Sequence, residues 1–222
     1  MASFERYRHP DDLPQSIPVF PLAGALLLPR ADLPLNIFEP RYLAMIDHAI
    51  ATDRLIGMIQ PAEGEPASDG TALMKVGCVG RITAWQEAPD ERMLITLTGV
   101  SRFQIVAELD VDTPFRQVIA NYHPFAADLA SGAGSAEVNR PALLRVFRDY
   151  LDANNMSADW KEVDQASTEV LVNTLSLLAP YPPEEKQALL EAPDLKTRAD
   201  VLVALTEVAL GKMGKGAKPR LQ

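Results

Sequence analysis

The sequence predicts an α+β protein in which a curled antiparallel β-domain with one helix, resembling an incomplete barrel, precedes an α-helical bundle. Three observations carry this prediction. Before about residue 125, short apolar runs are interrupted by Pro and Gly, as in a chain of short strands. After about residue 135, apolar residues recur at helical spacing. The stretch between them, residues 125–135, is rich in Gly, Ala and Ser and predicts a linker or surface loop.

One helix is predicted inside the β-half. Pro40 is tolerated in a first helical turn, because its missing N–H would have no partner there. The residues that follow have apolar side chains at 3–4 spacing, namely Tyr42, Met45, Ile46, Ala49 and Ile50. A strand over residues 54–59 and a polar loop over residues 61–70 are predicted next.

The strongest strand pattern lies between residues 74 and 109. Apolar residues alternate from Met74 to Trp85, and Gly77 and Gly80 interrupt the pattern as bulges do when a sheet curls. The polar segment 86–91 predicts a hairpin loop. Alternation resumes after it, and we expect a turn at residues 99–101 and a last strand within residues 115–122.

The second half is predicted to be helical. Ser135 is a plausible N-cap of its first helix, residues 159–178 form the second, Pro183 opens a short third, and Asp194 caps the last. The predicted organisation is an N-terminal extension (1–15), the β-domain (16–122), a linker (123–135), the bundle (136–210) and a basic flexible tail (211–222).

Composition restricts the function. The chain has 222 residues, is 47% hydrophobic and carries a formal net charge of −9, which disfavours binding to nucleic acid. The first ten residues lack an apolar segment and no apolar run is long enough to span a membrane, so we expect a cytoplasmic protein with no membrane partner. No catalytic residue, metal ligand or cofactor is predicted, since His9, His48 and His123 lack metal-site spacing and Cys78 lies on an apolar strand face.

Four segments resemble the N-terminal domain of the Lon proteases in order and spacing. They are Ile17–Leu22, Leu33–Tyr42, Val76–Ile82 and Leu97–Ile105. The resemblance implies a PUA-like pseudo-barrel with one helix, followed by helices such as those of stand-alone bacterial members. It also implies that the chain binds polypeptide substrates or partner proteins, with a separate protease among the options and self-association left open.

Lon-type proteases carry an ATPase module and a Ser–Lys peptidase domain after this domain. The 222 residues contain neither a phosphate-binding loop nor a peptidase serine motif. We therefore expect a protein without enzymatic activity. Two alternatives stay open: a pseudo-barrel that binds a small molecule or RNA, and an uncharacterised enzyme whose pocket would contain Glu39, Arg41 or Arg102.

Two sets of residues are singled out. The first marks the family and is expected to serve the fold, with Glu39 at the helix N-terminus, Arg41 on a nearby loop or carbonyl, and Arg102 between strands. It consists of Phe38, Glu39, Pro40, Arg41, Tyr42, Gly77, Gly99, Arg102 and Phe103. The second set contains weak candidates for contacts with a bound peptide, chosen as adaptable or aromatic side chains on strands. It consists of Met58, Trp85 and Met93.

Overall fold

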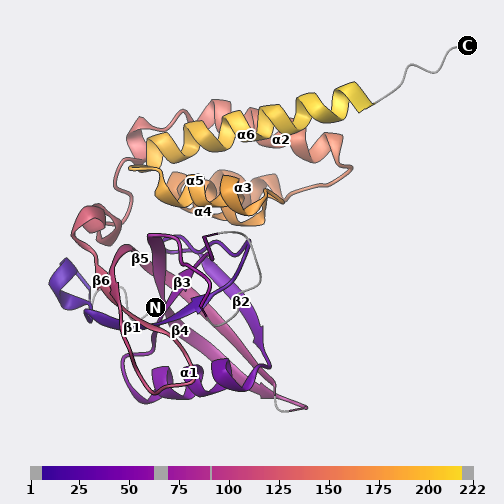
Figure 1. The fold of residues 1–222 in the computed structure, drawn as a ribbon. Helices are drawn as coiled ribbons and strands as arrows, with labels where there is room; N and C mark the ends of the chain where they lie inside the picture. Colours follow the sequence, from indigo (N-terminus) through magenta and orange to yellow (C-terminus); the bar gives the residue numbers. More distant parts are fainter. Residues whose placement is uncertain (1–6, 63–69, 91, 217–222) are drawn as a thin grey trace, which may run out of the picture.

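The structure is a computed structural model that describes residues 7–62, 70–90 and 92–216, with side chains to Lys212. It confirms the α+β class: strands and one helix occupy the first half, and a layer of helices covers one end of the sheet (Figure 1). The first half contains η2 (Pro10–Asp12), β1 (Ser16–Pro21), β2 (Asp32–Ile37), α1 (Pro40–Ala51), β3 (Leu55–Ile59), β4 (Val76–Ala88), β5 (Arg92–Glu108) and β6 (Gln117–Asn121).

The six strands form one curled sheet. Their order is β2-β5-β4-β3-β1-β6, and β6 also pairs with β5, so that the sheet curls back on itself. The sheet is mixed, because β1 and β3 are parallel whereas the other pairs are antiparallel. The expectation of a purely antiparallel sheet was therefore wrong in one pair. Parallel neighbours need a crossover connection, which β2 and α1 provide here.

The longest strand, β5, runs without interruption through residues 99–101, where a turn was expected. Gly99 lies inside this strand, because another backbone segment passes very close to it. The amide of Arg30 donates to the Gly99 carbonyl, and Gly99 donates to the Ala31 carbonyl. A Cβ at position 99 would lie only 2.0 Å from the carbonyl oxygen of Leu28. Glycine in a strand therefore marks a close backbone approach at this position.

The hairpin between β4 and β5 is present, but its strands extend further than expected. β4 continues to Ala88 and β5 starts at Arg92, so residues 86–88 of the predicted loop 86–91 are paired. The register shifts between Val79 and Gly80, in agreement with the expected bulge. The predicted helix is α1, which lies at the end of the β-half away from the helical layer (Figure 1).

The helical layer differs from its prediction at two boundaries. Its elements are η3 (His123–Leu129), η4 (Ser135–Glu137), α2 (Arg140–Ala153), α3 (Trp160–Gln165), α4 (Thr168–Leu178), α5 (Pro183–Glu191) and α6 (Leu195–Gly216). Asn139, not Ser135, caps α2 by accepting from the amide of Ala142 at 3.1 Å. The helix expected over residues 159–178 is divided in two, since Ser167 leaves helical geometry and caps α4.

The last helix starts as expected, with the Asp194 carboxylate accepting from the amide of Thr197 at 2.7 Å. It continues to Gly216, so residues 211–216 of the predicted flexible tail are helical, while residues 217–222 lie outside the described part. No helix within the described ranges combines the length and apolarity needed to cross a bilayer.

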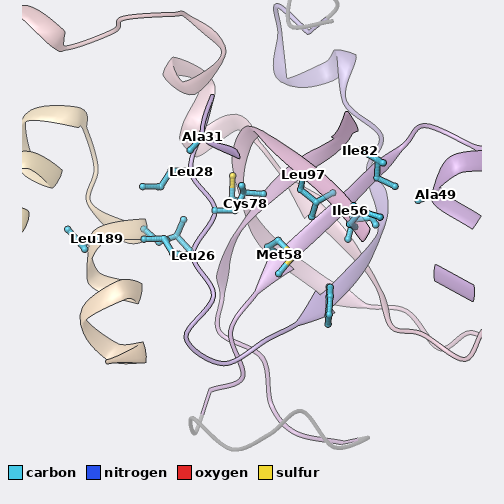
Figure 2. Packing of buried hydrophobic residues seen from close by; sticks show 14 of the residues in the cluster. Leu26, Leu28, Ala31, Ala49, Ile56, Met58, Cys78, Ile82, Leu97 and Leu189 are labelled. Atoms are coloured by element: carbon cyan, nitrogen blue, oxygen red, sulfur yellow. The ribbon is translucent and has the colours of Figure 1, made fainter. Parts of the chain in front are cut away.

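The larger of two apolar clusters extends from the sheet into the helical layer. In Figure 2, Leu189 of α5 lies beside Leu26, and the same cluster continues through Cys78 to Leu97 in the sheet. A second cluster fills the other part of the curled sheet around Phe103. The division at residues 122 and 136 stays a prediction, and the apolar core continues across it.

Candidate functional site

Arg102 joins the sheet to the helical layer. Its guanidinium donates to both carboxylate oxygens of Asp128 in η3, each at 2.8 Å, and its amide donates to the same carboxylate at 2.9 Å. It also donates to the carbonyls of Leu190 and Ala192 at the end of α5. Arg102 therefore connects β5 to the helices rather than to another strand, which corrects its predicted role. The predicted linker contributes the buried carboxylate and is part of this junction.

Two further arginines lie at the same junction. Arg30 pairs with Glu169 of α4 and donates to the Asp128 carbonyl. Arg198 of α6 donates to the Leu189 carbonyl and to the Asn173 side chain, and burial, followed by the Arg102 charge, lowers its pKa to about 10. The Nε of Arg30 and the Nη2 of Arg198 are buried without a hydrogen-bond partner among the described atoms. Arg30 therefore joins the β-half to the helical layer, whereas Arg198 connects α6 to α5 and α4 within that layer.

The marker residues at the start of α1 form a compact turn. The Glu39 carbonyl accepts the amides of Tyr42 and Leu43, both at 3.0 Å, while its carboxylate accepts from the Nε of Arg41 at 3.0 Å. The Arg41 guanidinium lies over the Tyr42 ring, 4.6 Å from its centroid. Glu39 was expected at the helix N-terminus, where it lies, and its pairing with Arg41 was not expected. Glu39 precedes the helix, so its extended backbone lets the two side chains meet.

Gly77 and Phe103 belong to the packing of the sheet. A Cβ on Gly77 would lie 2.6 Å from both the Met58 carbonyl oxygen and the Phe103 ring, which is fully buried. Phe38, by contrast, is 63% exposed beside the α1 turn. A structural role for the marker set agrees with these contacts and stays a prediction for the set as a whole.

The three candidates for peptide contacts are not brought together. Met58 is 3% exposed within the larger core cluster, which does not agree with a surface role. Met93 is partly buried against the same cluster. Trp85 is 43% exposed, and Arg54 lies over its ring. It lines a shallow depression of about 450 Å³ across β2, β5 and β4, together with Leu94 and Leu35.

The helical layer contains an apolar pocket that the sequence analysis did not identify. It has a volume of about 380 Å³ and lies between α2, α4 and α6, bordered by residues 156–158 and 179–181. We call it the helical-layer pocket. Its lining residues are all uncharged: Leu143, Val146, Phe147, Tyr150, Leu151, Met156, Ser157, Ala158, Leu175, Leu178, Ala179, Pro180, Tyr181, Leu202, Val203 and Thr206.

Hydroxyl groups form the polar part of this lining. The Thr206 hydroxyl donates to the Leu202 carbonyl, so the 2.7 Å contact between Thr206 and Tyr181 uses the Tyr181 proton. Burial is the main cause of a raised pKa at Tyr181. Its phenolic oxygen therefore stays neutral at physiological pH and can accept a hydrogen bond. The pocket contains no nucleophile paired with a base, and its chemistry suits the binding of apolar groups.

Other chemical groups do not combine into a second site within the described residues. No three His, Cys, Asp or Glu side chains come together there as metal ligands. Burial raises the pKa of the Cys78 thiol, which keeps it protonated. Glu39 and Arg41 lie at the α1 turn, while Arg102 is buried at the junction, so the residues that an enzyme site would need are in separate places.

The sequence of this chain is similar to the sequences of curated Lon proteases. "Lon protease 2" of Myxococcus xanthus is 26% identical over 207 residues, covering 88% of this chain and 24% of the relative. "Lon protease" of Roseiflexus castenholzii is 26% identical over 206 residues, covering 89% of this chain and 25% of the relative. The chain thus spans about a quarter of the length of these curated relatives.

Solved structures show the same fold. A Lon N-terminal domain protein from Xanthomonas campestris has a TM-score of 0.59 at 22% identity and covers 85% of this chain and 97% of its own. The N-terminal domain of a Mycobacterium avium complex Lon protease has a TM-score of 0.61 at 18% identity and covers 86% of this chain and 98% of its own. The family model for the ATP-dependent protease La (LON) substrate-binding domain matches residues 16–207, from β1 into α6. The chain therefore belongs to the LON substrate-binding domain family.

Proposed function

We propose that this chain binds polypeptides without catalysing a reaction on them. The observation that carries the proposal is the match of residues 16–207 to a substrate-binding domain family. The helical-layer pocket supports it, since an uncharged, largely apolar recess suits apolar side chains that an unfolded or partner polypeptide exposes.

The relatives named above are proteases, and we propose that this chain likewise holds polypeptides for proteolysis, by a protease domain or a partner protease. The residues 7–62, 70–90 and 92–216 would act in recognition, in the cytoplasm, alone or as a homo-oligomer. No cofactor is needed for this role.

The two alternatives have weaker support. The formal net charge of −9 opposes RNA binding. An enzyme would need convergent polar groups, whereas Glu39, Arg41 and Arg102 are engaged with partners in two different places. A small apolar ligand could occupy the helical-layer pocket, and the experiment must therefore include one.

The test is a binding titration of the full chain at physiological salt. A fluorescently labelled model protein, kept unfolded by reduction and carboxymethylation, is the ligand, and its anisotropy is measured. We expect saturable binding at micromolar concentration, none to the same protein in its native state, and none to a labelled RNA oligonucleotide. The absence of binding to any unfolded protein would refute the proposal. ATP hydrolysis or peptide cleavage by the purified chain would refute its non-catalytic part.

A further inference from the structure

We propose that residues 7–14 form a strap that covers a binding surface on the β-half, and that a polypeptide segment with the same two anchors, a tyrosine and a leucine six positions later, replaces it there. This inference rests on the proposed function. It adds a second contact surface, separate from the helical-layer pocket, and the chemistry of the segment that it binds.

The strap is anchored by two side chains. Tyr7 and Leu13 are each 4% exposed and belong to the smaller apolar cluster around Phe103. Residues 8–12 between them are exposed, apart from the half-buried Pro10. Two buried anchors joined by an exposed arch resemble a bound peptide, in which a few buried side chains carry most of the binding energy.

The backbone of the strap folds on itself. The Asp12 amide donates to the His9 carbonyl at 3.0 Å, and the Leu13 amide donates to the Pro10 carbonyl at 3.2 Å. The Asp12 carboxylate accepts from the amides of Arg8 and His9, both at 2.8 Å. The strap therefore keeps its shape through its own hydrogen bonds and can leave the sheet as a unit.

Pairing with the sheet starts after the strap. The Gln15 carbonyl accepts from the Ala120 amide at 2.7 Å, and β1 then pairs with β6 from Ser16 onwards. The strap is the indigo segment beside β6 in Figure 1. Its removal leaves the strands β1 and β6 paired.

Two side-chain donors of the β-half contact the strap. Arg81 of β4 donates from Nη1 to the Tyr7 hydroxyl at 3.1 Å, and the Tyr122 hydroxyl donates to the Pro14 carbonyl at 3.0 Å. Burial, with smaller contributions from Cys78 and Tyr7, raises the pKa of Tyr122, so its hydroxyl stays a donor. Every peptide has a carbonyl for Tyr122, whereas Arg81 favours tyrosine over phenylalanine at the first anchor.

The exposed arch adds one weaker contact. The Nε2 of His123 lies 3.3 Å from the Asp11 carboxylate, and both side chains are exposed. Exposed ion pairs contribute little to binding or stability. The two anchors and the two donors, rather than the arch, therefore define the segment that fits.

The strap competes with any other segment because it is tethered to its surface. A short tether gives the strap an effective concentration of about millimolar, so a free peptide of the same sequence at ten micromolar would occupy only roughly 1% of the sites. A polypeptide that makes further contacts elsewhere on the chain overcomes this competition. The strap thus excludes segments that bind only weakly.

The experiment uses the full chain and a labelled peptide with the sequence of residues 7–14. The strap variant carries Tyr7→Ser and Leu13→Ser, which remove both anchors. Val106→Ser with Val111→Ser is the matched control, because it removes two exposed apolar side chains outside the strap. Anisotropy titrations measure the dissociation constant of the peptide for each chain.

We expect the peptide to bind the strap variant at least about tenfold more tightly than it binds the unmodified chain or the control variant. A peptide with serine at both anchor positions should not bind. A peptide carrying Tyr7→Phe should bind more weakly, since it offers no acceptor to Arg81. Equal binding of all three peptides to the strap variant would overturn the inference.

Thermal unfolding shows whether the strap variant folds. We expect its melting temperature to be lower, because two buried side chains are lost, and the peptide to raise it, because a ligand of the folded state stabilises that state. The peptide should not change the melting temperature of the control variant. A strap variant that stays unfolded with saturating peptide would show that residues 7–14 are a fixed part of the core and would overturn the inference.

Thiol labelling tests whether the strap opens in a chain that retains it. Leu13→Cys places a thiol at an anchor, and Val118→Cys places one at a fully buried position of the same cluster on β6. We expect a disulfide reagent to modify the first variant without denaturant, and faster when the unfolded model protein is present, while the second stays protected. Equal protection of the two thiols would mean that the strap does not open, and the inference would be wrong.

The outcomes separate this inference from the proposed function. If the unfolded model protein binds the unmodified chain but the peptide does not bind the strap variant, the inference is wrong and the proposed function stands. If neither binds either chain, the proposed function fails as well. If an anilinonaphthalene dye binds the strap variant and the peptide does not displace it, the uncovered surface is a small-molecule site and the inference is wrong.

Discussion

Replacing Asp128 with Ala tests whether the Arg102 junction holds the two halves of the chain together. Asp128 accepts three N–H groups of Arg102, from the amide, Nε and Nη2. Both side chains are buried, so the variant leaves a guanidinium without its counter-charge away from water. The cost of removing one partner of a buried ion pair is about 3–5 kcal/mol. Domain stabilities are only about 5–15 kcal/mol, so this is a large share of the total.

The assay is urea unfolding followed by circular dichroism, with the free energy of unfolding obtained by linear extrapolation. Asp200→Ala is the matched control, because it also removes a carboxylate from an ion pair, the exposed i,i+4 pair with Lys196. We expect this control to leave the unfolding free energy nearly unchanged, since exposed pairs contribute little. The double variant Arg102→Met with Asp128→Leu removes both charges and should be more stable than Asp128→Ala.

The reasoning is refuted if Asp128→Ala lowers the unfolding free energy no more than Asp200→Ala does. It is also refuted if the double variant is less stable than Asp128→Ala, because the cost would then come from lost packing and not from the isolated charge.

Three further predictions concern single positions. Gly99→Ala places a Cβ 2.0 Å from the Leu28 carbonyl oxygen and should lower the unfolding free energy by about 1–3 kcal/mol. Its control is Gly211→Ala, since Gly211 is helical and a Cβ there would have no atom within 4 Å. This control should raise the melting temperature, because alanine has the higher helix propensity. The hydrogen bond from the Thr197 amide lowers the pKa of Asp194 below its unfolded value of 3.8. The cap therefore stabilises the fold at pH values above 3.8, and this contribution is lost as the pH falls through the lowered pKa. Asp194→Ala should lower the free energy of unfolding at neutral pH by up to about 1 kcal/mol, measured by urea unfolding over a range of pH. Cys78 is buried and its thiol pKa is raised, so a disulfide reagent should modify it only after denaturation, and rapid labelling of the native chain would contradict the structure.

Local signals in the sequence predicted most elements of the β-half. Pro40 and the apolar spacing after it located α1, and the alternation around Cys78 located β4. The prediction of a turn at residues 99–101 was wrong, because a glycine in a strand can also mark the close approach of another backbone segment. At Gly99 that backbone is the segment around Leu28, roughly seventy residues earlier, and no local pattern shows this contact. The parallel pairing of β1 and β3 is equally non-local.

The same limit applies to the junction and to the pocket. Arg102 was expected to link strands, since its neighbours are strand residues, but its acceptors come from η3 and α5. Leu143, Leu175 and Leu202 lie on apolar helix stripes, which predict packing between helices. Three such stripes can pack together completely or leave a recess between them. The outcome depends on the division of residues 159–178 into α3 and α4 and on the packing of the connections, and periodicity predicts neither of these two features.

The residues that mark the family and the residues that line the helical-layer pocket therefore belong to different parts of the structure. Gly99 and Phe103 are constrained by backbone contact and burial in the sheet, and Arg102 by its bonds to the helical layer. These demands are independent of what the protein binds. Leu178 and Met156 line the helical-layer pocket and are largely exposed, so burial does not constrain them in this way. Substitutions there can change the ligand without unfolding the chain, so differences in specificity between members of the family should arise in the helical layer.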